Sequence, residues 1–307
     1  MSPVMQHGIL AGLIGVNIGK SLSPALFEDA CAAHELRGHY HLVDLAEVPT
    51  RSLGDVLSAA RLVGFRGLNI TYPCKEAVLP LLDALSEEAH QIGAVNTVVI
   101  EPDGKTTGFN TDRVGFRRAF EEELGPTAAR GQAVVLVGAG GAGKAVAFAL
   151  ADLGADTLLV HDKRPDQAGK LVEAINRQLG AARARVHLDP AAALADAAGV
   201  VNATPVGMLG ATAGTPLATA AIAARHWVAD VIYTPLETEL IKASAAKGAR
   251  TMGGAGMCIH QAAETFRLLT GLAPDVARMR RTFAAAAASR DQPTAAGTHA
   301  GEKGHGP

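Results

Sequence analysis

A glycine-rich motif could bind the phosphates of a dinucleotide. Gly138, Gly140 and Gly143 have the spacing G-x-G-x-x-G, with four apolar residues before them and an apolar helix pattern after them. Such glycines allow a tight turn, admit a pyrophosphate and let the helix pack on the strand, while the helix N-terminus attracts phosphate. A second predicted strand, Thr157 to Val160, leads to Asp162, nineteen residues after Gly143, where a carboxylate could bind a ribose. The pattern predicts a dinucleotide site; the alternative is an ordinary strand–helix turn.

Two serines separated by one residue precede a predicted helix. Ser21 and Ser23 follow a predicted buried strand, Ile9 to Gly15, and a helix pattern starts at Pro24. Serine followed by proline is typical of a helix N-cap, so Ser23 is expected to cap this helix. Ser21 is not needed for that cap. Two hydroxyls at a helix start can also bind a carboxylate, and this interpretation stays open for both residues.

A lysine lies at the start of a predicted helix, where the helix dipole disfavours it. The segment Gly67 to Thr71 is predicted to be a strand, Pro73 ends it, and a helix pattern begins at Cys74. Lys75 therefore falls in the first helical turn, although cations are more stable at the opposite end. A residue that violates a local preference at the end of a strand is a candidate for function. The alternative is a solvated surface lysine.

Two further polar residues lie near a predicted β-hairpin. The segments Ala94 to Ile100 and Thr106 to Asn110 are predicted to pair as its strands. Asn96 is unfavourable in such a strand unless its amide has a partner. Asp112 precedes a predicted helix, about Val114 to Glu123, and could be its N-cap.

These elements indicate an α/β protein with two domains. Residues 1–112 are predicted to form an N-terminal α/β domain, and residues 113–255 a Rossmann-type domain with a doubly wound parallel sheet. Two C-terminal helices within residues 256–285 are predicted to fold back across both domains and to complete the first. Residues 286–307 contain too few apolar side chains to fold and are predicted to be a disordered tail.

Composition excludes several classes of partner. The 307-residue chain has a net charge of −2, which gives no electrostatic reason to expect nucleic acid or a membrane surface. Cys31, Cys74 and Cys258 show no paired or metal-ligand spacing, so we expect reduced thiols and no metal. The sequence shows no pattern of a signal peptide or a transmembrane helix, so a cytoplasmic protein is expected. The oligomeric state is not predicted.

Taken together, the motifs resemble the shikimate dehydrogenase family, and in particular its quinate/shikimate dehydrogenase members. They occur in the family's order from near residue 10 to about residue 285. The segments that support the resemblance are Ser21–Pro24, Gly67–Lys75, Gly93–Thr97, Gly108–Asp112, Gly138–Gly143, Val201–Met208, Val231–Tyr233 and Gly256–Gln261.

The resemblance implies an oxidoreductase that transfers hydride between NAD(P) and the ring carbinol of shikimate, with quinate as an alternative substrate. Lys75 and Asp112 would form the catalytic pair that moves the hydroxyl proton, while the cofactor takes the hydride. The substrate-binding residues would be Ser21, Ser23 and Tyr233 at the carboxylate, and Asn69, Thr71, Asn96 and Gln261 at the ring hydroxyls.

The resemblance also implies a set of cofactor-binding residues. They are Gly138, Ala139, Gly140, Gly141, Ala142, Gly143, Asp162, Arg164, Asn202, Thr204, Pro205, Gly207, Met208, Gly254 and Met257. Members that use NADP typically have Asn-Arg-Thr after the second strand, where the arginine meets the 2′-phosphate. Asp162 would repel that phosphate and suits the 2′-hydroxyl of NAD, so NAD is expected rather than NADP, although Lys163 and Arg164 weaken the contrast. Asn202 and Thr204 could instead stabilise a turn.

Two other functions fit parts of the sequence. A non-catalytic module could sense NAD or shikimate, but the presence of both Lys75 and Asp112 argues against it. A related dehydrogenase could act on an aminoshikimate-type or folate-linked substrate, whereas the paired serines and Gln261 favour a carboxylated polyol. Between shikimate and quinate, Ser23 favours shikimate weakly, because quinate-accepting relatives can have threonine there.

Overall fold

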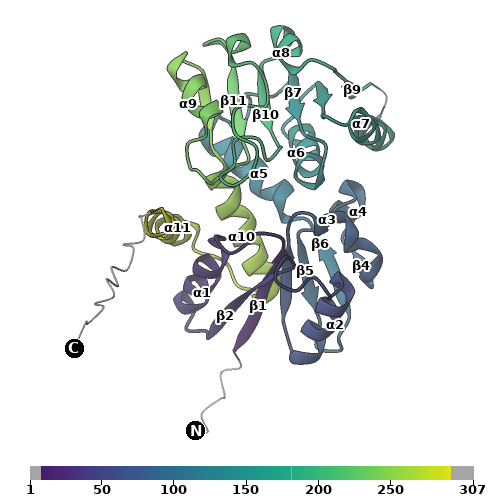
Figure 1. Cartoon of the computed structure of the whole chain (residues 1–307), viewed down its shortest axis with the longest axis vertical. Helices are drawn as coiled ribbons and strands as arrows, with labels where there is room; N and C mark the ends of the chain where they lie inside the picture. Colours follow the sequence, from purple (N-terminus) through teal and green to yellow (C-terminus); the bar gives the residue numbers. More distant parts are fainter. Residues whose placement is uncertain (1–7, 181, 292–307) are drawn as a thin grey trace, which may run out of the picture.

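The protein consists of two lobes, each built on a six-stranded sheet (Figure 1). The structure is a computed structural model and describes residues 8–180 and 182–291. The predicted α/β fold class, with a Rossmann-type sheet in the second lobe, is confirmed. The domain boundaries at residues 112 and 255 stay a prediction.

The first lobe contains a mixed sheet. Its strands have the order β2-β1-β3-β5-β6-β4, and β5 runs antiparallel to both of its neighbours. The antiparallel pair β5–β6 is the hairpin that the sequence predicts. The strands are β1 (Ile9–Gly15), β2 (Gly38–Asp44), β3 (Gly67–Ile70), β4 (Ala84–Leu85), β5 (Thr97–Ile100) and β6 (Thr106–Phe109).

The helices of the first lobe follow local sequence signals. For example, α2 begins with a capping box between Ser52 and Asp55 and ends at Gly64, whose φ is 84°. The helix predicted to begin at Cys74 has only one turn, α3, and continues as a 3-10 helix, because Pro80 has no amide hydrogen to extend the α-helical pattern. The helices are α1 (Ser23–Ala33), α2 (Leu53–Val63), α3 (Cys74–Ala77) and α4 (Glu87–Ile92), with a 3-10 helix at Leu79–Leu81.

The second lobe contains an entirely parallel sheet in the order β12-β11-β10-β7-β8-β9. This is the Rossmann order, in which the order of successive strands reverses between β7 and β10, and such sheets bind ligands at that point. The strands are β7 (Ala133–Val137), β8 (Thr157–His161), β9 (Ala184–Val186), β10 (Gly199–Asn202), β11 (Trp227–Asp230) and β12 (Arg250–Met252).

Apolar side chains cover both faces of this parallel sheet. Along β7, for example, Leu136 faces one core cluster and Val135 the other. The helices that flank the sheet are α6 (Gly141–Asp152), α7 (Pro165–Leu179), α8 (Pro190–Ala193) and α9 (Glu239–Ala246), with 3-10 helices at Leu194–Asp196 and Thr219–Ala221.

Two long helices, α5 (Thr111–Glu123) and α10 (Gly254–Thr270), lie between the lobes (Figure 1). They pack closely because each has a glycine at the contact. A Cβ on Gly115 would lie 2.8 Å from the carbonyl oxygen of Met257, and one on Gly256 would lie 2.9 Å from the Cβ of Ala119. Side chains larger than hydrogen would therefore separate the helices.

The last helix, α11 (Val276–Arg290), packs against α1, where Arg278 forms an ion pair with Asp29 at 2.7 Å. The helix continues five residues past the predicted end at residue 285. The start of the predicted tail at residue 286 was therefore wrong, because the alanine-rich segment favours helix. Residues 292–307 of that tail lie outside the described residues.

Gly115→Ala should destabilise the protein by about 1–3 kcal/mol, since overpacking outweighs the roughly 1 kcal/mol gain in helix propensity. Gly169→Ala is the matched control: Gly169 lies in α7, and a Cβ there meets nothing within 4 Å, so this change should not destabilise the protein. Urea unfolding of both variants measures the difference. Equal stabilities would contradict the close contact between α5 and α10.

Candidate active site

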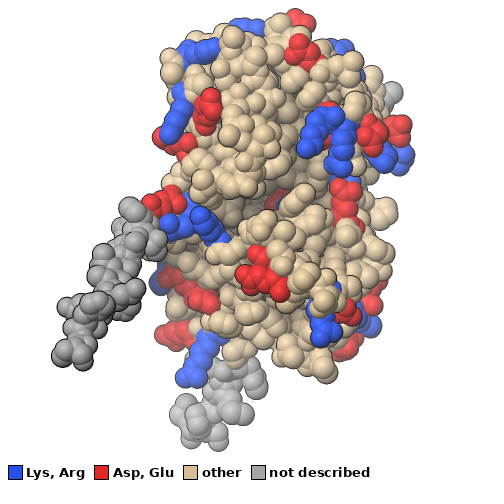
Figure 2. Space-filling view, viewed as in Figure 1, with Lys and Arg blue, Asp and Glu red and all other residues tan. Residues whose placement is uncertain are grey.

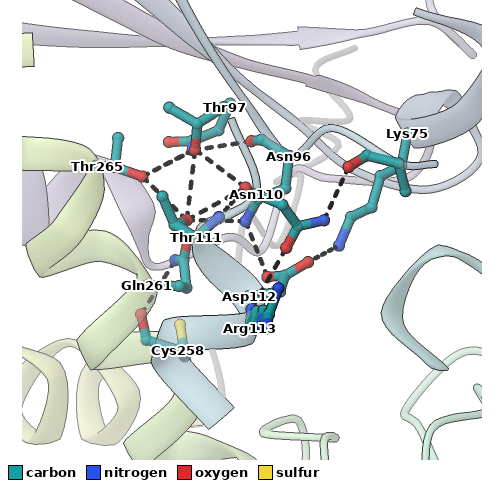
Figure 3. Close-up of polar contacts among 12 residues, drawn as sticks. Lys75, Asn96, Thr97, Asn110, Thr111, Asp112, Arg113, Cys258, Gln261 and Thr265 are labelled. Carbon is teal, nitrogen blue, oxygen red and sulfur yellow. Dashed lines mark hydrogen bonds and ion pairs between the residues drawn. The ribbon is translucent and has the colours of Figure 1, made fainter. Parts of the chain in front are cut away.

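Lys75 and Asp112 form an ion pair at the junction of the lobes (Figure 3). Lys75 Nζ lies 2.6 Å from Asp112 Oδ2, and the side chains are 16% and 7% exposed. Lys75 comes from the first turn of α3 and Asp112 from the first turn of α5. Asp112 is not the N-cap that the sequence allowed, because Asn110 occupies that position and accepts a hydrogen bond from the Arg113 amide. The Asp112 carboxylate is thus available to Lys75.

Asn96 fixes the other side of the Asp112 carboxylate. Its Nδ2 donates to Asp112 Oδ1 at 2.9 Å, and its Oδ1 accepts from the Thr111 backbone amide at 2.7 Å. Asn96 is buried immediately before β5, where an unpaired amide would be costly. Both oxygens of Asp112 are therefore held, one by Lys75 and one by Asn96.

A deeper set of polar residues surrounds Asn69, and three of its members were missed in the sequence: Tyr40, Thr97 and Thr265. Asn69 Nδ2 donates to Thr97 Oγ1 at 2.9 Å and to Thr265 Oγ1 at 3.1 Å, and Tyr40 Oη donates to Asn69 Oδ1 at 2.7 Å. Thr265 could have been found, because it lies one helical turn after Gln261 and so shares its helix face. The partner of Tyr40 depends on sheet order, which no local pattern reveals.

The two serines lie together at the start of α1. Ser21 Oγ donates to Ser23 Oγ at 3.1 Å and accepts from the Ser23 backbone amide at 3.2 Å. The prediction of Ser23 as N-cap was wrong: Leu22 occupies the cap position, and no side chain caps it. The chain turns at Ile18, whose carbonyl accepts from the Ser21 amide, so Ser21 faces the helix start.

Tyr233 follows β11 and contacts the C-terminal helix. Its ring lies edge-on to Phe283 of α11, with centroids 6.1 Å apart, in the same apolar cluster as Leu22. Burial raises the pKa of Tyr233, so its phenol stays a neutral hydrogen-bond donor. This packing brings Tyr233 to the helix start that contains both serines.

Thr71 and Gln261 approach the same region from two other elements. Thr71 is half-buried after β3, where its methyl group fills the space left by Gly15. Gln261 lies on α10, and its Nε2 donates to the Cys258 carbonyl at 3.0 Å (Figure 3). Its Oε1 remains available as an acceptor.

The glycine-rich loop has the geometry that the sequence predicts. Gly138 has a φ of 105°, which favours glycine, and a side chain at Gly143 would collide with the Gly138 carbonyl. Gly140 faces open space at the N-terminus of α6, with nothing within 4 Å of a Cβ placed there. A Cβ on Gly141 would lie 3.2 Å from the Lys75 side chain. The loop therefore adjoins the ion pair.

Asp162 connects the end of β8 to this loop. Its Oδ2 accepts from the Ala139 amide at 2.8 Å, and its Oδ1 accepts from the Arg164 amide at 2.9 Å. Each carboxylate oxygen can accept a second hydrogen bond, so a ribose hydroxyl could still bind. The Arg164 side chain is 61% exposed, and its Nε lies 4.0 Å from the carboxylate.

The strand-end segment after β10 is stabilised by its own side chains. Asn202 Nδ2 donates to the Val206 carbonyl and to Asp230 Oδ1, each at 3.1 Å, and its Oδ1 accepts from the Thr204 hydroxyl at 2.7 Å. These contacts agree with the alternative in which Asn202 and Thr204 stabilise a turn. Pro205 and Met208 are exposed along this segment.

Three other predicted cofactor positions contact the protein or shape the backbone. Gly207 has a φ of 95°. A side chain at Gly254 would collide with the Val231 carbonyl, and Met257 lies in the main apolar core of the second lobe.

Comparison with known proteins identifies the family. The family model of the shikimate dehydrogenase substrate binding domain matches residues 13–98, and that of the shikimate 5'-dehydrogenase C-terminal domain matches residues 254–282. The quinate/shikimate dehydrogenase (NAD(+)) of Corynebacterium efficiens is 51% identical over 288 residues, covering 91% of this chain and 99% of the relative. The chain belongs to the shikimate dehydrogenase family.

Some of the similar relatives are named for NAD and others for NADP. The shikimate dehydrogenase (NADP(+)) of Streptomyces avermitilis is 47% identical, with coverage of 89% of this chain and 94% of the relative. The solved structure of quinate dehydrogenase from Corynebacterium glutamicum in complex with NAD has a TM-score of 0.85 and 47% identity, covering 91% of this chain and 99% of that one.

The described residues contain neither a candidate membrane helix nor a candidate metal site. No helix there combines the length and apolar character that a membrane span requires. No group of three or more His, Cys, Asp or Glu side chains in residues 8–180 and 182–291 is arranged to hold a metal ion.

Asp230, which holds Asn202, should make stability depend on pH. Burial raises its pKa from 3.8 to about 6, so between these pH values the folded protein binds more protons than the unfolded chain. The free energy of unfolding should then fall as the pH rises through this window, by at most about 1.4 kcal/mol per pH unit from this residue. Urea unfolding from pH 4 to pH 7 should show this loss in the wild type relative to Asp230→Asn. Parallel pH profiles would contradict the assignment.

Proposed function

We propose that the protein is an oxidoreductase that transfers hydride between NAD and the ring carbinol of shikimate, with quinate as an alternative substrate. The observation that supports this most directly is the Lys75–Asp112 pair, which lies against the glycine-rich loop at Gly141. A proton-transfer pair and a dinucleotide loop in contact are what alcohol oxidation requires. The names of the relatives support the same activity.

The second lobe fits a bound dinucleotide. The open space at Gly140 and the N-terminus of α6 would hold the pyrophosphate, and Asp162 would bind the adenosine ribose. The segment 202–208, with Arg164, Gly254 and Met257, completes the proposed cofactor site. When bound, the cofactor supplies the hydride acceptor.

The first lobe, together with Tyr233 of the second lobe and Gln261 of α10, supplies the partners for a carboxylated polyol. Ser21, Ser23 and Tyr233 converge at the start of α1 and would donate to the carboxylate. Thr71 and Gln261 would bind the ring hydroxyls. Asn69 and Asn96 are assigned positioning roles beside these residues, because their amide hydrogens already bond to protein oxygens.

The ion pair would move the substrate proton. During oxidation, the hydroxyl O–H bond breaks as the C–H hydride leaves for the hydride acceptor. The proton passes to the Lys75 amine, and Asp112 then holds the ammonium that forms. During reduction, the Lys75 ammonium donates to the carbonyl oxygen. Asn96 keeps Asp112 in place during both directions.

Lys75→Ala should lower kcat for shikimate oxidation by about a hundredfold or more, the usual scale of general acid–base catalysis, while KM changes far less. Asp112→Asn keeps the shape but removes the charge, so it should lower kcat too. The double variant should be little worse than either single one, because the residues act as a unit. Steady-state kinetics measure all three, with Lys242→Ala, an exposed lysine on α9, as control.

Multiplicative losses in the double variant would indicate two independent roles for Lys75 and Asp112. A Lys75→Ala protein with near-normal kcat would exclude the proposed proton transfer. Circular dichroism establishes that each variant is folded before its kinetics are compared.

The cofactor preference should be measurable as well. Because Asp162 is negative, kcat/KM with NAD should exceed that with NADP at least tenfold, or about 1.4 kcal/mol. Asp162→Asn keeps an oxygen for a backbone amide and removes the charge, so it should narrow the gap mainly by improving the use of NADP. Asp166→Asn, whose side chain is 65% exposed, is the control. Equal use of both cofactors by the wild type would show that Lys163 and Arg164 dominate.

A further inference from the structure

A cavity of about 300 Å³ lies beside the proposed carboxylate site. It is formed by the turn before α1, the segments after β10 and β11, and the end of α11. The residues that line it are Lys20, Leu209, Thr234, Pro235, Arg290 and Asp291. Lys20 directly precedes Ser21, and Thr234 directly follows Tyr233. The cavity therefore adjoins two of the three proposed carboxylate donors.

Arg290 is fixed in the wall of this cavity. Its side chain is 9% exposed, with Nη1 donating to Thr234 Oγ1 at 2.7 Å and Nε donating to Asp291 Oδ1 at 2.8 Å. Although burial dominates the pKa of Tyr233 and raises it, the positive charge of Arg290 acts in the opposite direction. The Arg290 charge therefore reaches the phenol proposed to bind the substrate.

Lys20 adds a second positive charge to the cavity. Its side chain is exposed and makes no hydrogen bond or ion pair to other described residues. The pKa of Asp291 is lowered by its hydrogen bond from Arg290 and, less strongly, by the charge of Lys20. With two cations and one carboxylate, the lining has a net charge of +1. Figure 2 shows Lys and Arg side chains beside the hollow between the lobes, near α11.

The proposed carboxylate donors themselves have no charge. Ser21, Ser23 and Tyr233 offer neutral hydroxyls, and in the described chain no lysine or arginine donates a hydrogen bond to them. A carboxylate that leaves water for neutral donors loses hydration free energy, which a nearby cation offsets. Positive charge at the entrance of a hollow also raises the local concentration of an anion and its association rate.

We propose that Lys20 and Arg290 form an anion-attracting entrance that guides the substrate carboxylate to Ser21 and Tyr233. This inference rests on the proposed function, because it takes the carboxylated polyol as the anion. Because Arg290 also holds α11 to Thr234, replacing it would disturb the packing as well as the charge. Lys20 makes no such contact with the described residues and is therefore the residue to test.

Lys20→Gln should lower kcat/KM for shikimate about threefold at low ionic strength and leave kcat nearly unchanged. The difference should disappear in about 1 M salt, where charges are screened within about 3 Å. Lys20→Arg should behave as the wild type, and Lys242→Gln, with an exposed lysine on α9, serves as the matched control. The uncharged methyl ester of shikimate should be used equally by the wild type and by Lys20→Gln.

The inference would be overturned if kcat/KM of Lys20→Gln for shikimate equalled that of the wild type at every ionic strength. It would also be overturned if Lys20→Gln lost as much kcat/KM with the methyl ester as with shikimate. If the wild type oxidises neither shikimate nor quinate, the proposed function fails. Calorimetric titration with shikimate then tests the inference separately, because Lys20→Gln should weaken binding by about the same factor. A wild type that does not bind shikimate would overturn both.

Discussion

The close packing of α5 against α10 determines how the two lobes meet. Gly115 and Gly256 let the two backbones approach, and α5 begins in the first lobe while α10 begins at the edge of the second. Asp112 lies in the first turn of α5, and Gln261 lies on the face of α10 beside Gly115. Because helices are rigid, this contact fixes proposed catalytic and substrate-binding residues in one frame.

The Lys75–Asp112 pair is stable in this frame because its neighbours satisfy it. A poorly solvated charge pair is costly when only its Coulomb attraction compensates for lost water. Here Asn96 supplies a further hydrogen bond to Asp112, and the position of Asp112 at a helix N-terminus favours its negative charge. Lys75 lies in a helix of only one turn, whose dipole has little effect on it, and its ammonium is held by the opposite charge of Asp112.

Local signals in the sequence predicted the elements well and long-range partners poorly. The glycine-rich loop, the parallel strands and the helix start at Lys75 depend on neighbouring residues and could be predicted. Tyr40 and Thr265 meet Asn69 only after the sheet and α10 have assembled, so their role was missed. The cap at Ser23 was wrong because Ser23 is already the first helical residue and Leu22 occupies the cap position, while a turn beginning at Ile18 places the Ser21 hydroxyl beside the Ser23 amide.

The polar residues of the family motifs divide according to where their hydrogen bonds go. Asn69 and Asn202 are buried and donate through their amides to protein oxygens, so binding a ligand through those hydrogens would require breaking existing bonds. Thr71 and Tyr233 are only partly buried. The Thr71 hydroxyl makes no hydrogen bond to the described protein, and the Tyr233 phenol lies beside the Ser21 hydroxyl. The residues that can contact a substrate directly are therefore fewer than the motif residues, and the others build the strand ends and turns that position them.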